Sequence, residues 1–181
     1  MSNILLLGPG KSRARIDGKP EFGIVPDEVL TVLDYDKVVL AEWQNSAECV
    51  SCDLRYGHLW PLSNGSFDAV HAYEVLNLLP GDEYVFFRLW RDMWRVLKPN
   101  GRVYATTPHW QSRWIHAYPG QQRVYTPELL AYLDHGKHLT AKSDFPDLWP
   151  LPYNFVTVEA WDVCAHPEAP PQGFQFVLEK K

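Results

Sequence analysis

Short, largely apolar segments recur along this chain, and each of the first three is followed by a glycine or a carboxylate. The segments are 4–7, 29–33 and 48–52, and the residues after them are Gly8-Pro9-Gly10, Asp34-Tyr35-Asp36 and Asp53-Leu54. Hydrophobicity that is continuous rather than alternating is typical of strands covered on both faces. In open parallel sheets, ligands bind at the carboxyl ends of the strands. The pattern therefore predicts an α/β sheet with a binding site at these strand ends.

Further elements extend this sheet. The turn Asn64-Gly65-Ser66 leads into a predicted strand over 67–73, and a fifth strand is expected over 102–107. Alternating apolar residues predict two more strands over 154–163 and 174–178, which would form a terminal hairpin with 165–172 as its loop. The predicted fold is a single α/β domain over 1–181, mainly parallel with an antiparallel C-terminal hairpin.

Helices are expected at three places. A short helix is predicted over 37–46, and apolar residues at helical spacing predict an amphipathic helix over 82–97 that Pro99-Asn100-Gly101 stops. Thr126 followed by Pro127 is typical of a helix start, so a helix is predicted from about 127 to 134. Residues 11–26 have no helical period and are predicted to be a loop.

Charge and composition narrow the classes of partner. The chain carries 17 Lys and Arg against 22 Asp and Glu, a formal net charge of −5, which argues against general nucleic-acid binding. No apolar run approaches the length of about 18 residues that spans a bilayer, and the first residues do not resemble a signal peptide. Three cysteines do not make a disulfide framework. We therefore expect a cytoplasmic protein without membrane partners.

The residues at the strand ends have two interpretations. Gly8 and Gly10 would let the backbone approach a ligand closely, Asp34 or Asp36 would accept hydrogen bonds from ribose hydroxyls, and Asp53-Leu54 would bind an amino group and pack on a ring. The alternative is an ordinary turn followed by solvated strand ends. The occurrence of such residues after successive strands favours the binding site.

The chain resembles class I S-adenosylmethionine-dependent methyltransferases. The resemblance rests on Gly8-x-Gly10, Asp34, Asp53-Leu54 and the segment 62–76, and most of all on Arg95-Val96-Leu97-Lys98-Pro99-Asn100-Gly101-Arg102-Val103, which is similar to the turn that precedes the fifth strand in that family. It implies a Rossmann-like sheet of seven strands and S-adenosylmethionine as the cofactor. It also implies cofactor contacts from Gly8, Gly10, Asp34, Asp53 and Leu54, with Tyr73 and Glu74 near the methyl group.

Two features depart from the family pattern. Leu6 stands where the family commonly has an acid, and the loop 11–26 replaces the usual first helix, as in short members of the family. Lys11 and Arg13 would suit an anion better than a sulfonium. Two alternatives to a methyltransferase therefore stay open: a non-catalytic binding or assembly protein that has lost the cofactor, and an enzyme that uses another nucleotide.

The expected reaction is methyl transfer to an oxygen or nitrogen of a small-molecule or macromolecular acceptor. This chemistry needs mostly positioning, with a base where the acceptor is a hydroxyl. His109 is the first candidate base and Glu74 the second. Trp110, Arg113 and Trp114 are candidate acceptor-binding residues, and the alternative is that the tryptophans only cover the core. Cys49 and Cys52 would point to opposite faces of a strand, so no metal site is predicted.

Overall fold

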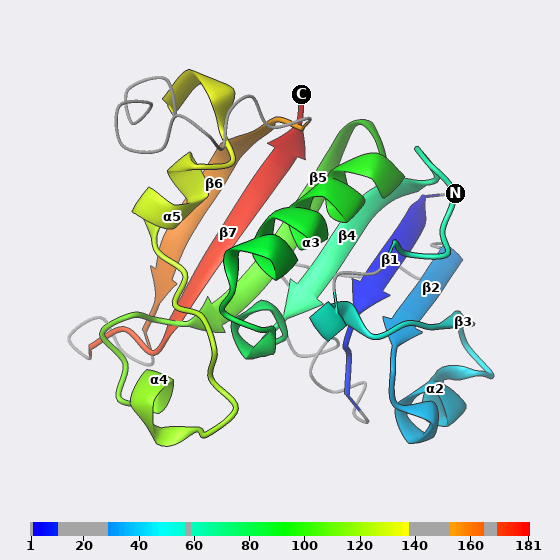
Figure 1. Ribbon diagram of the computed structural model, residues 1–181, viewed down its shortest axis with the longest axis horizontal. Helices are drawn as coiled ribbons and strands as arrows, with labels where there is room; N and C mark the ends of the chain where they lie inside the picture. Colours follow the sequence, from blue (N-terminus) through cyan, green and yellow to red (C-terminus); the bar gives the residue numbers. More distant parts are fainter. Residues whose placement is uncertain (1, 11–28, 57–58, 138–152, 165–169) are drawn as a thin grey trace.

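The computed structural model describes residues 2–10, 29–56, 59–137, 153–164 and 170–181. Within these ranges a seven-stranded sheet has the order β3-β2-β1-β4-β5-β7-β6 (Figure 1). Strands β1 to β5 pair in parallel, whereas β7 is antiparallel to both β5 and β6. The strands are β1 (Asn3–Leu7), β2 (Val29–Asp34), β3 (Glu48–Ser51), β4 (Phe67–Tyr73), β5 (Leu97–Pro108), β6 (Phe155–Val163) and β7 (Gly173–Lys180). The predicted α/β sheet with its antiparallel C-terminal hairpin is confirmed.

Helices lie at the three predicted places with different lengths, and one further short helix over 114–117 was not predicted. They are α2 (Lys37–Trp43), α3 (Glu83–Val96), α4 (Trp114–Ala117) and α5 (Pro127–Ala131), with 3₁₀ turns η2 (Leu54–Tyr56) and η3 (Leu76–Leu78). The helix expected over 37–46 ends at Trp43, whose carbonyl accepts hydrogen bonds from the N–H groups of Ser46 and Ala47. None of the helices in the described part of the chain has the length and apolarity needed to cross a bilayer.

Helices α3 and α5 each begin with a side-chain cap, and of these two caps the Thr126 cap was predicted. The Asp82 side chain accepts a hydrogen bond from the Val85 N–H at the start of α3, and Thr126 caps α5 through the Leu129 N–H. The loop predicted over 11–26 lies outside the described residues. Of the hairpin loop predicted over 165–172, residues 170–172 are described and contain no strand.

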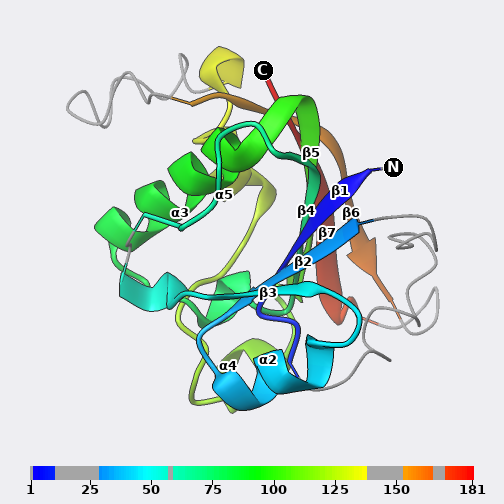
Figure 2. The same ribbon diagram turned by 90° about the vertical axis from the view of Figure 1, so that its right-hand side faces the viewer.

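The core has two parts, one on each face of the sheet. Helix α3 covers one face of the sheet (Figure 2), and its side chains Phe86, Leu89 and Trp90 belong to the same buried cluster as Leu5 and Leu7 of β1. Alternate residues of the same strand, Ile4 and Leu6, point to the other face, where they pack with Val39 and Trp43 of α2. Burial on both faces explains why β1 is apolar at successive positions rather than at every second one.

Two cationic side chains, one near the end of α3 and one near the start of β5, fix the junction of these two elements. Arg95 forms an ion pair with Asp92 at 2.9 Å and donates to the carbonyls of Leu62 and Trp60 at 2.6 and 3.0 Å. Lys98 contacts both carboxylate oxygens of Asp68 at 2.8 Å. The Arg95 contacts tie the segment before β4 to the end of α3, and the Lys98 contact ties β5 to β4. The residues that carry the family resemblance here therefore have a structural task.

Candidate functional site

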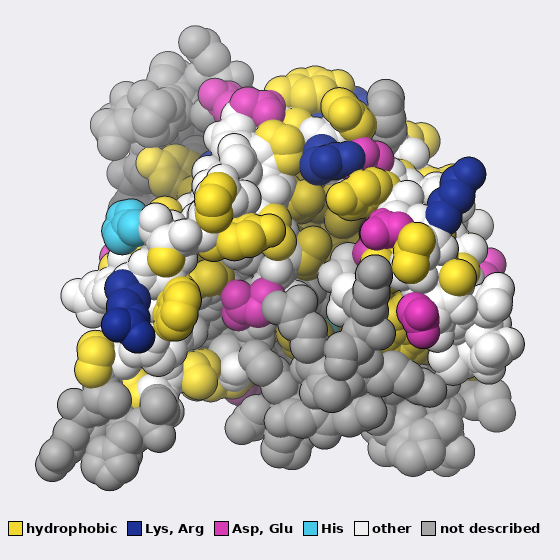
Figure 3. All heavy atoms as spheres, turned by 90° about the horizontal axis from the view of Figure 1, so that it is seen from below, with side chains coloured by type: hydrophobic (Ala, Val, Ile, Leu, Met, Phe, Trp, Pro, Cys, Tyr) yellow, Lys and Arg dark blue, Asp and Glu magenta, His cyan; other side chains and the backbone are white. Residues whose placement is uncertain are grey.

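A cleft of about 390 Å³ lies at the carboxyl ends of the parallel strands. Figure 3 looks onto this edge of the sheet and shows Asp and Glu side chains there among apolar ones. The described residues that line the cleft come from the ends of β1, β2, β3 and β4, from α2, from η2 and η3, and from the segment after α4. They are Gly8, Gly10, Asp34, Tyr35, Asp36, Val39, Cys52, Asp53, Leu54, Arg55, Glu74, Val75, Leu78, Leu79, Tyr118 and Gly120.

The glycine segment after β1 approaches the segment after β4 closely. Gly8 and Gly10 have φ of +50° and +68°, a region that favours glycine. A Cβ on Gly8 would lie 2.5 Å from Cγ2 of Val75, so a side chain there requires a rearrangement. The Gly8 N–H donates to the Leu33 carbonyl at 2.9 Å, and the Trp43 indole N–H donates to the Gly10 carbonyl at 3.1 Å. The strand β2 and helix α2 therefore hold the backbone of this segment in place.

Asp34 and Asp36 have different tasks. Asp34 is buried and its Oδ1 accepts a hydrogen bond from the Asp36 N–H at 2.9 Å. Burial raises the pKa of Asp34 above its usual value, and the N–H groups of Asp36 and Tyr35 partly counter that effect. The carboxylate of Asp36 instead caps α2, accepting from the Val38 N–H at 2.8 Å. Both line the cleft, and Asp36 is partly committed to the helix.

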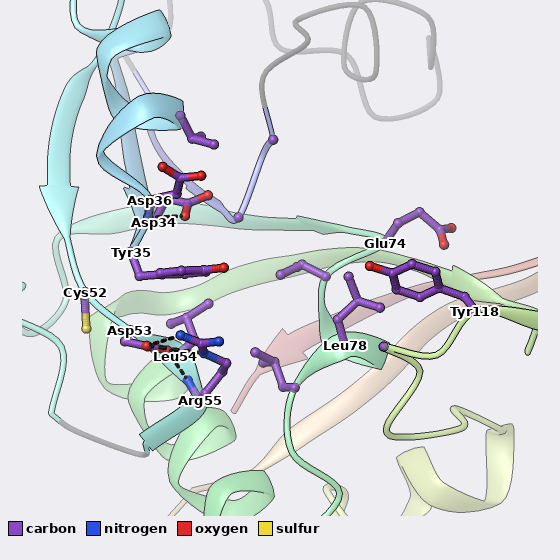
Figure 4. Close-up of a pocket in the computed structure, with 16 residues that line it drawn as sticks. Asp34, Tyr35, Asp36, Cys52, Asp53, Leu54, Arg55, Glu74, Leu78 and Tyr118 are labelled. Carbon is purple, nitrogen blue, oxygen red and sulfur yellow. Dashed lines mark hydrogen bonds and ion pairs between the residues drawn. The ribbon is translucent and has the colours of Figure 1, made fainter.

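One end of the cleft contains Tyr35, Asp53 and Arg55, and we call it the Arg55 end (Figure 4). The guanidinium of Arg55 binds Asp53 through Nη2 to Oδ2 at 2.7 Å and through Nε to Oδ1 at 2.9 Å. Its Cζ lies 4.3 Å from the centre of the Tyr35 ring. The hydrogen bonds with Asp53 raise the pKa of Arg55 above its usual value. A cation thus covers both the carboxylate and the ring.

The opposite end contains Glu74 and Tyr118, and we call it the Glu74 end (Figure 4). Glu74 follows β4 with φ of +55°, which a residue with a side chain adopts at a cost of about 1–3 kcal/mol. Its N–H donates to the Thr106 carbonyl of β5 at 2.9 Å. The conformation turns the chain away from the sheet and places the Glu74 carboxylate at the cleft.

Tyr118 reaches the cleft because its segment is attached to η3. The Asn77 carbonyl accepts from the N–H groups of Gln122 and Arg123 at 2.8 and 3.2 Å, and Asn77 Nδ2 donates to Gln121 Oε1 at 2.8 Å. A Cβ on Gly120 would lie 2.5 Å from Cε1 of Tyr118, so the ring rests directly on this glycine. These contacts bring an aromatic side chain from a distant part of the chain to the Glu74 end.

A family model described as a methyltransferase domain matches residues 7–105, which is more than half of the chain. This chain belongs to that methyltransferase family. The matched part contains the glycine segment, β2 to β4 and nearly all of β5, and so most of the cleft. No curated protein matches the sequence.

Solved structures agree with the family in fold. A methyltransferase from Methanosarcina mazei has a TM-score of 0.64 at 15% identity, covering 99% of this chain and 92% of its own. A Burkholderia thailandensis 1,6-didemethyltoxoflavin-N1-methyltransferase with bound S-adenosylhomocysteine has a TM-score of 0.63 at 16% identity, and the match covers 99% of this chain and 71% of its own. The N-methyltransferase NodS from Bradyrhizobium japonicum, also with S-adenosylhomocysteine, has a TM-score of 0.62 at 16% identity, and the match covers 99% of this chain and 78% of its own.

The methyltransferase family supports S-adenosylmethionine as the cofactor, and the cleft of this chain fits it. The volume lies in the range of about 300–1,000 Å³ usual for small-molecule sites. The glycine segment offers backbone without side chains, and the buried Asp34 offers an acceptor for hydroxyl groups. When bound, the cofactor supplies a methyl group on a sulfonium.

Of the nine predicted cofactor-binding and catalytic residues, the structure brings seven to this cleft. Gly8, Gly10, Asp34, Asp36, Asp53, Leu54 and Glu74 are among its described lining residues. Tyr73 is not. Its ring is buried on the α2 face, and its hydroxyl is hydrogen-bonded to Nδ1 of His71. Burial lowers the pKa of His71 to about 4, so this ring is neutral near neutral pH.

His109 also lies outside the described lining of the cleft. Its side chain is 1% exposed. Its Nδ1 accepts from the Gln111 N–H at 3.1 Å. Its Nε2 lies 3.3 Å from Oδ1 of Asp162 on β6, close enough for an ion pair although not aligned as a hydrogen bond. Both ring nitrogens therefore face groups of the protein, and His109 links the end of β5 to the terminal hairpin.

The three predicted acceptor-binding residues separate into two groups. Trp110 packs edge-on against Phe174 in the core. Trp114 is 55% exposed on α4, with the Arg113 guanidinium 5.2 Å from its ring. None of the three is among the described lining residues. In the described ranges, no group of three His, Cys, Asp or Glu side chains has the geometry to hold a metal ion.

Sequence reasoning missed Tyr35, Arg55 and Tyr118 as cleft residues. Tyr35 and Arg55 had a usable signal, because each lies one or two residues from a carboxylate already singled out at a strand end. Tyr118 had none, because its place depends on the attachment of its segment to Asn77.

Proposed function

We propose that this protein transfers a methyl group from S-adenosylmethionine to an oxygen or nitrogen of an acceptor that enters at the Glu74 end of the cleft. The observation that carries the proposal is the division of the cleft. A planar, carboxylate-containing Arg55 end suits a purine, and an acidic Glu74 end with an exposed aromatic ring suits an acceptor. Asp34, which also lines the cleft, would accept hydrogen bonds from the ribose hydroxyls.

Glu74 is our candidate catalytic base. Its carboxylate would accept a hydrogen bond from the attacking N–H or O–H group and then the proton, while Tyr118 packs against the body of the acceptor. His109 is a weaker candidate because its ring is buried against Asp162 and Gln111. Arg113 and Trp114 would contact only an acceptor large enough to extend from the cleft to α4.

Charge favours nitrogen over oxygen in the acceptor. Among the described lining residues, Asp34, Asp36, Asp53 and Glu74 are acidic, and Arg55 is the one cation, already paired with Asp53. Such a cleft attracts a protonated amine, which needs to lose a proton before it attacks. Two of the similar structures are N-methyltransferases, which supports the same choice.

One observation favours the alternative, a methyltransferase-like binding or assembly protein without cofactor: Arg55 already covers Tyr35 and Asp53. Calorimetry distinguishes the two. S-adenosylmethionine and S-adenosylhomocysteine should bind, whereas NAD and ATP should not. Asp34→Asn should weaken binding, and Asp162→Asn, which changes a half-exposed aspartate outside the cleft lining, should not. The absence of any heat with both S-adenosyl compounds would contradict the proposal.

The acceptor is best sought with the cofactor bound. Pools of primary and secondary amines, phenols and sugar-like hydroxyl compounds would be incubated with protein and S-adenosylmethionine, and S-adenosylhomocysteine would be measured. If wild type forms S-adenosylhomocysteine with an amine and Glu74→Gln does not, the result would support transfer to nitrogen.

We place the reaction in the cytoplasm, which the free Cys49, Cys52 and Cys164 support, since free thiols suit a reducing compartment.

A further inference from the structure

Arg55 makes the contacts that an aminopurine would need. It offers N–H groups at the edge of a flat, delocalised cation, much as the amino edge of adenine offers them from a flat ring. Its N–H groups engage both oxygens of Asp53, at 2.7 to 3.2 Å, and its backbone N–H adds a further bond to Oδ1 at 3.0 Å. Its guanidinium lies over the Tyr35 ring at 4.3 Å. A carboxylate and an aromatic face are the pair of groups with which a site recognises an aminopurine.

The guanidinium is held weakly enough to leave. The Arg55 side chain is 43% exposed and that of Asp53 is 20% exposed, so their ion pair is screened by water. The contact with Tyr35, a residue that is itself 54% exposed, adds a modest cation–π attraction. A ligand with better stacking area and the same hydrogen-bonding edge can therefore displace it.

We propose that Arg55 is an internal competitor of the adenine group, so that this residue sets the affinity of the cleft for its cofactor and its selectivity for adenine. This inference rests on the proposed function. Removal of an ordinary binding residue weakens binding, whereas removal of Arg55 should tighten it. If the guanidinium instead stayed in place and stacked on the purine, its removal would weaken binding.

The chain offers a matched control. Arg102 pairs with Glu179 at 3.1 Å, with exposures of 44% and 14%, and it lies on β5 outside the described lining of the cleft. Arg55→Met and Arg102→Met thus remove the same side chain from pairs of similar exposure. Calorimetry would use S-adenosylhomocysteine, 5′-methylthioadenosine and S-inosylhomocysteine, in which oxygen replaces the adenine amino group.

Arg55→Met should bind S-adenosylhomocysteine and 5′-methylthioadenosine about fivefold more tightly than wild type. S-inosylhomocysteine should gain less, because it lacks the amino group that binds Asp53. Arg102→Met should bind all three as wild type does. In wild type, the Arg55 Nε–H signal in ¹⁵N NMR, assigned through its loss in Arg55→Met, should change its chemical shift when S-adenosylhomocysteine binds, because Nε–H then loses its hydrogen bonds to Asp53.

Equal or weaker binding by Arg55→Met, with wild type still binding, would overturn the inference and leave the proposed function intact. If Arg55→Met binds S-adenosylhomocysteine and wild type does not, the result would support both the proposed function and the inference, and Arg55 would be a stronger competitor than expected. Failure of every variant to bind any S-adenosyl compound would overturn the proposed function and the inference with it. S-adenosylmethionine would be titrated in parallel. A larger gain in its affinity than in that of the compounds without a sulfonium would indicate simple charge repulsion and also count against the inference.

Discussion

The two ends of the cleft are assembled over very different distances along the chain. At the Arg55 end, Asp53 and Arg55 are two residues apart, and Tyr35 follows a neighbouring strand. At the Glu74 end, Tyr118 lines the cleft together with Glu74 because contacts with Asn77 fix the segment after α4. Local geometry sets the first end and tertiary packing sets the second. We therefore expect changes at the Arg55 end to act on cofactor affinity and changes at the Glu74 end to act on turnover.

The largest effect should come from Glu74→Gln. The amide keeps the size of the side chain and the backbone strain but cannot take a proton, so turnover of the acceptor should fall about 100-fold or more. Affinity for S-adenosylhomocysteine should stay within about twofold, measured by calorimetry on the same preparation. A parallel loss of affinity would contradict the division between the two ends.

Gly8→Ala should disturb both ends at once, because the glycine segment packs on Val75 next to Glu74. The added Cβ would meet Val75 Cγ2 at a residue with positive φ, and the expected loss of unfolding free energy is about 2–4 kcal/mol. Gly65→Ala is the control, since φ there is +60° with no atom within 4 Å of the added Cβ. Urea denaturation should give the smaller loss for Gly65→Ala; equal losses would mean that the contact with Val75 relaxes freely.

Asp34→Asn should weaken S-adenosylhomocysteine binding about ten- to a hundredfold, because a hydrogen bond to a charged acceptor is lost. Wild-type affinity should also fall on acidification, beginning above the pH at which an exposed aspartate titrates, because burial raises the pKa of Asp34. The variant should lack this step. Calorimetry between acidic and neutral pH checks both, and an unchanged step in the variant would assign it to another group.

The same raised pKa predicts an opposite effect on stability. A carboxyl group whose pKa is higher in the folded than in the unfolded state favours folding most below its unfolded pKa. That contribution disappears as the pH rises through the folded pKa. Asp34→Asn should therefore unfold at a higher temperature than wild type at neutral pH, and the gap should close in acid. A lower melting temperature at neutral pH would mean that hydrogen bonds of Asp34 outweigh its burial.

The smallest effect should come from Trp114→Ala. This side chain is half-exposed on α4, so its removal should change the unfolding free energy by no more than about 0.5 kcal/mol. Trp90→Ala, at a fully buried tryptophan of α3, should cost about 3–5 kcal/mol and shows what a core truncation looks like. Unchanged turnover in Trp114→Ala would indicate an acceptor that ends within the cleft.

The distance along the chain also explains what could be predicted from the sequence. The strands and α3 were predictable from their apolar patterns. A strand buried on both faces is apolar at successive positions, as in Leu5 to Leu7, and a helix buried on one face is apolar at helical spacing, as in Phe86, Leu89 and Trp90. The strand-end residues followed from topology, since parallel strands end at one edge. His109 sits just beyond the end of the long strand β5, yet the terminal hairpin covers it.

Which face a side chain takes was the harder part of the prediction. Tyr73 and Glu74 are neighbours in the chain. Tyr73 points to the α2 face as the strand alternation requires, whereas the positive φ of Glu74 directs its side chain to the cleft. The tasks of Asp34 and Asp36 also depend on a hydrogen bond to a helix start that the sequence does not distinguish. Tertiary packing, rather than local propensity, decides these cases.

The strand order has a consequence for how the molecule is made. Among the described strands, β6 reaches the sheet only through β7, although β7 follows it in the chain. As the polypeptide emerges from a ribosome, β6 has no strand to pair with until β7 has been made and pairs with β5. Until then Val103 and Ala105, which are fully buried in the finished protein, lie on an open edge. This interval is when the nascent chain is most exposed to aggregation and to chaperones.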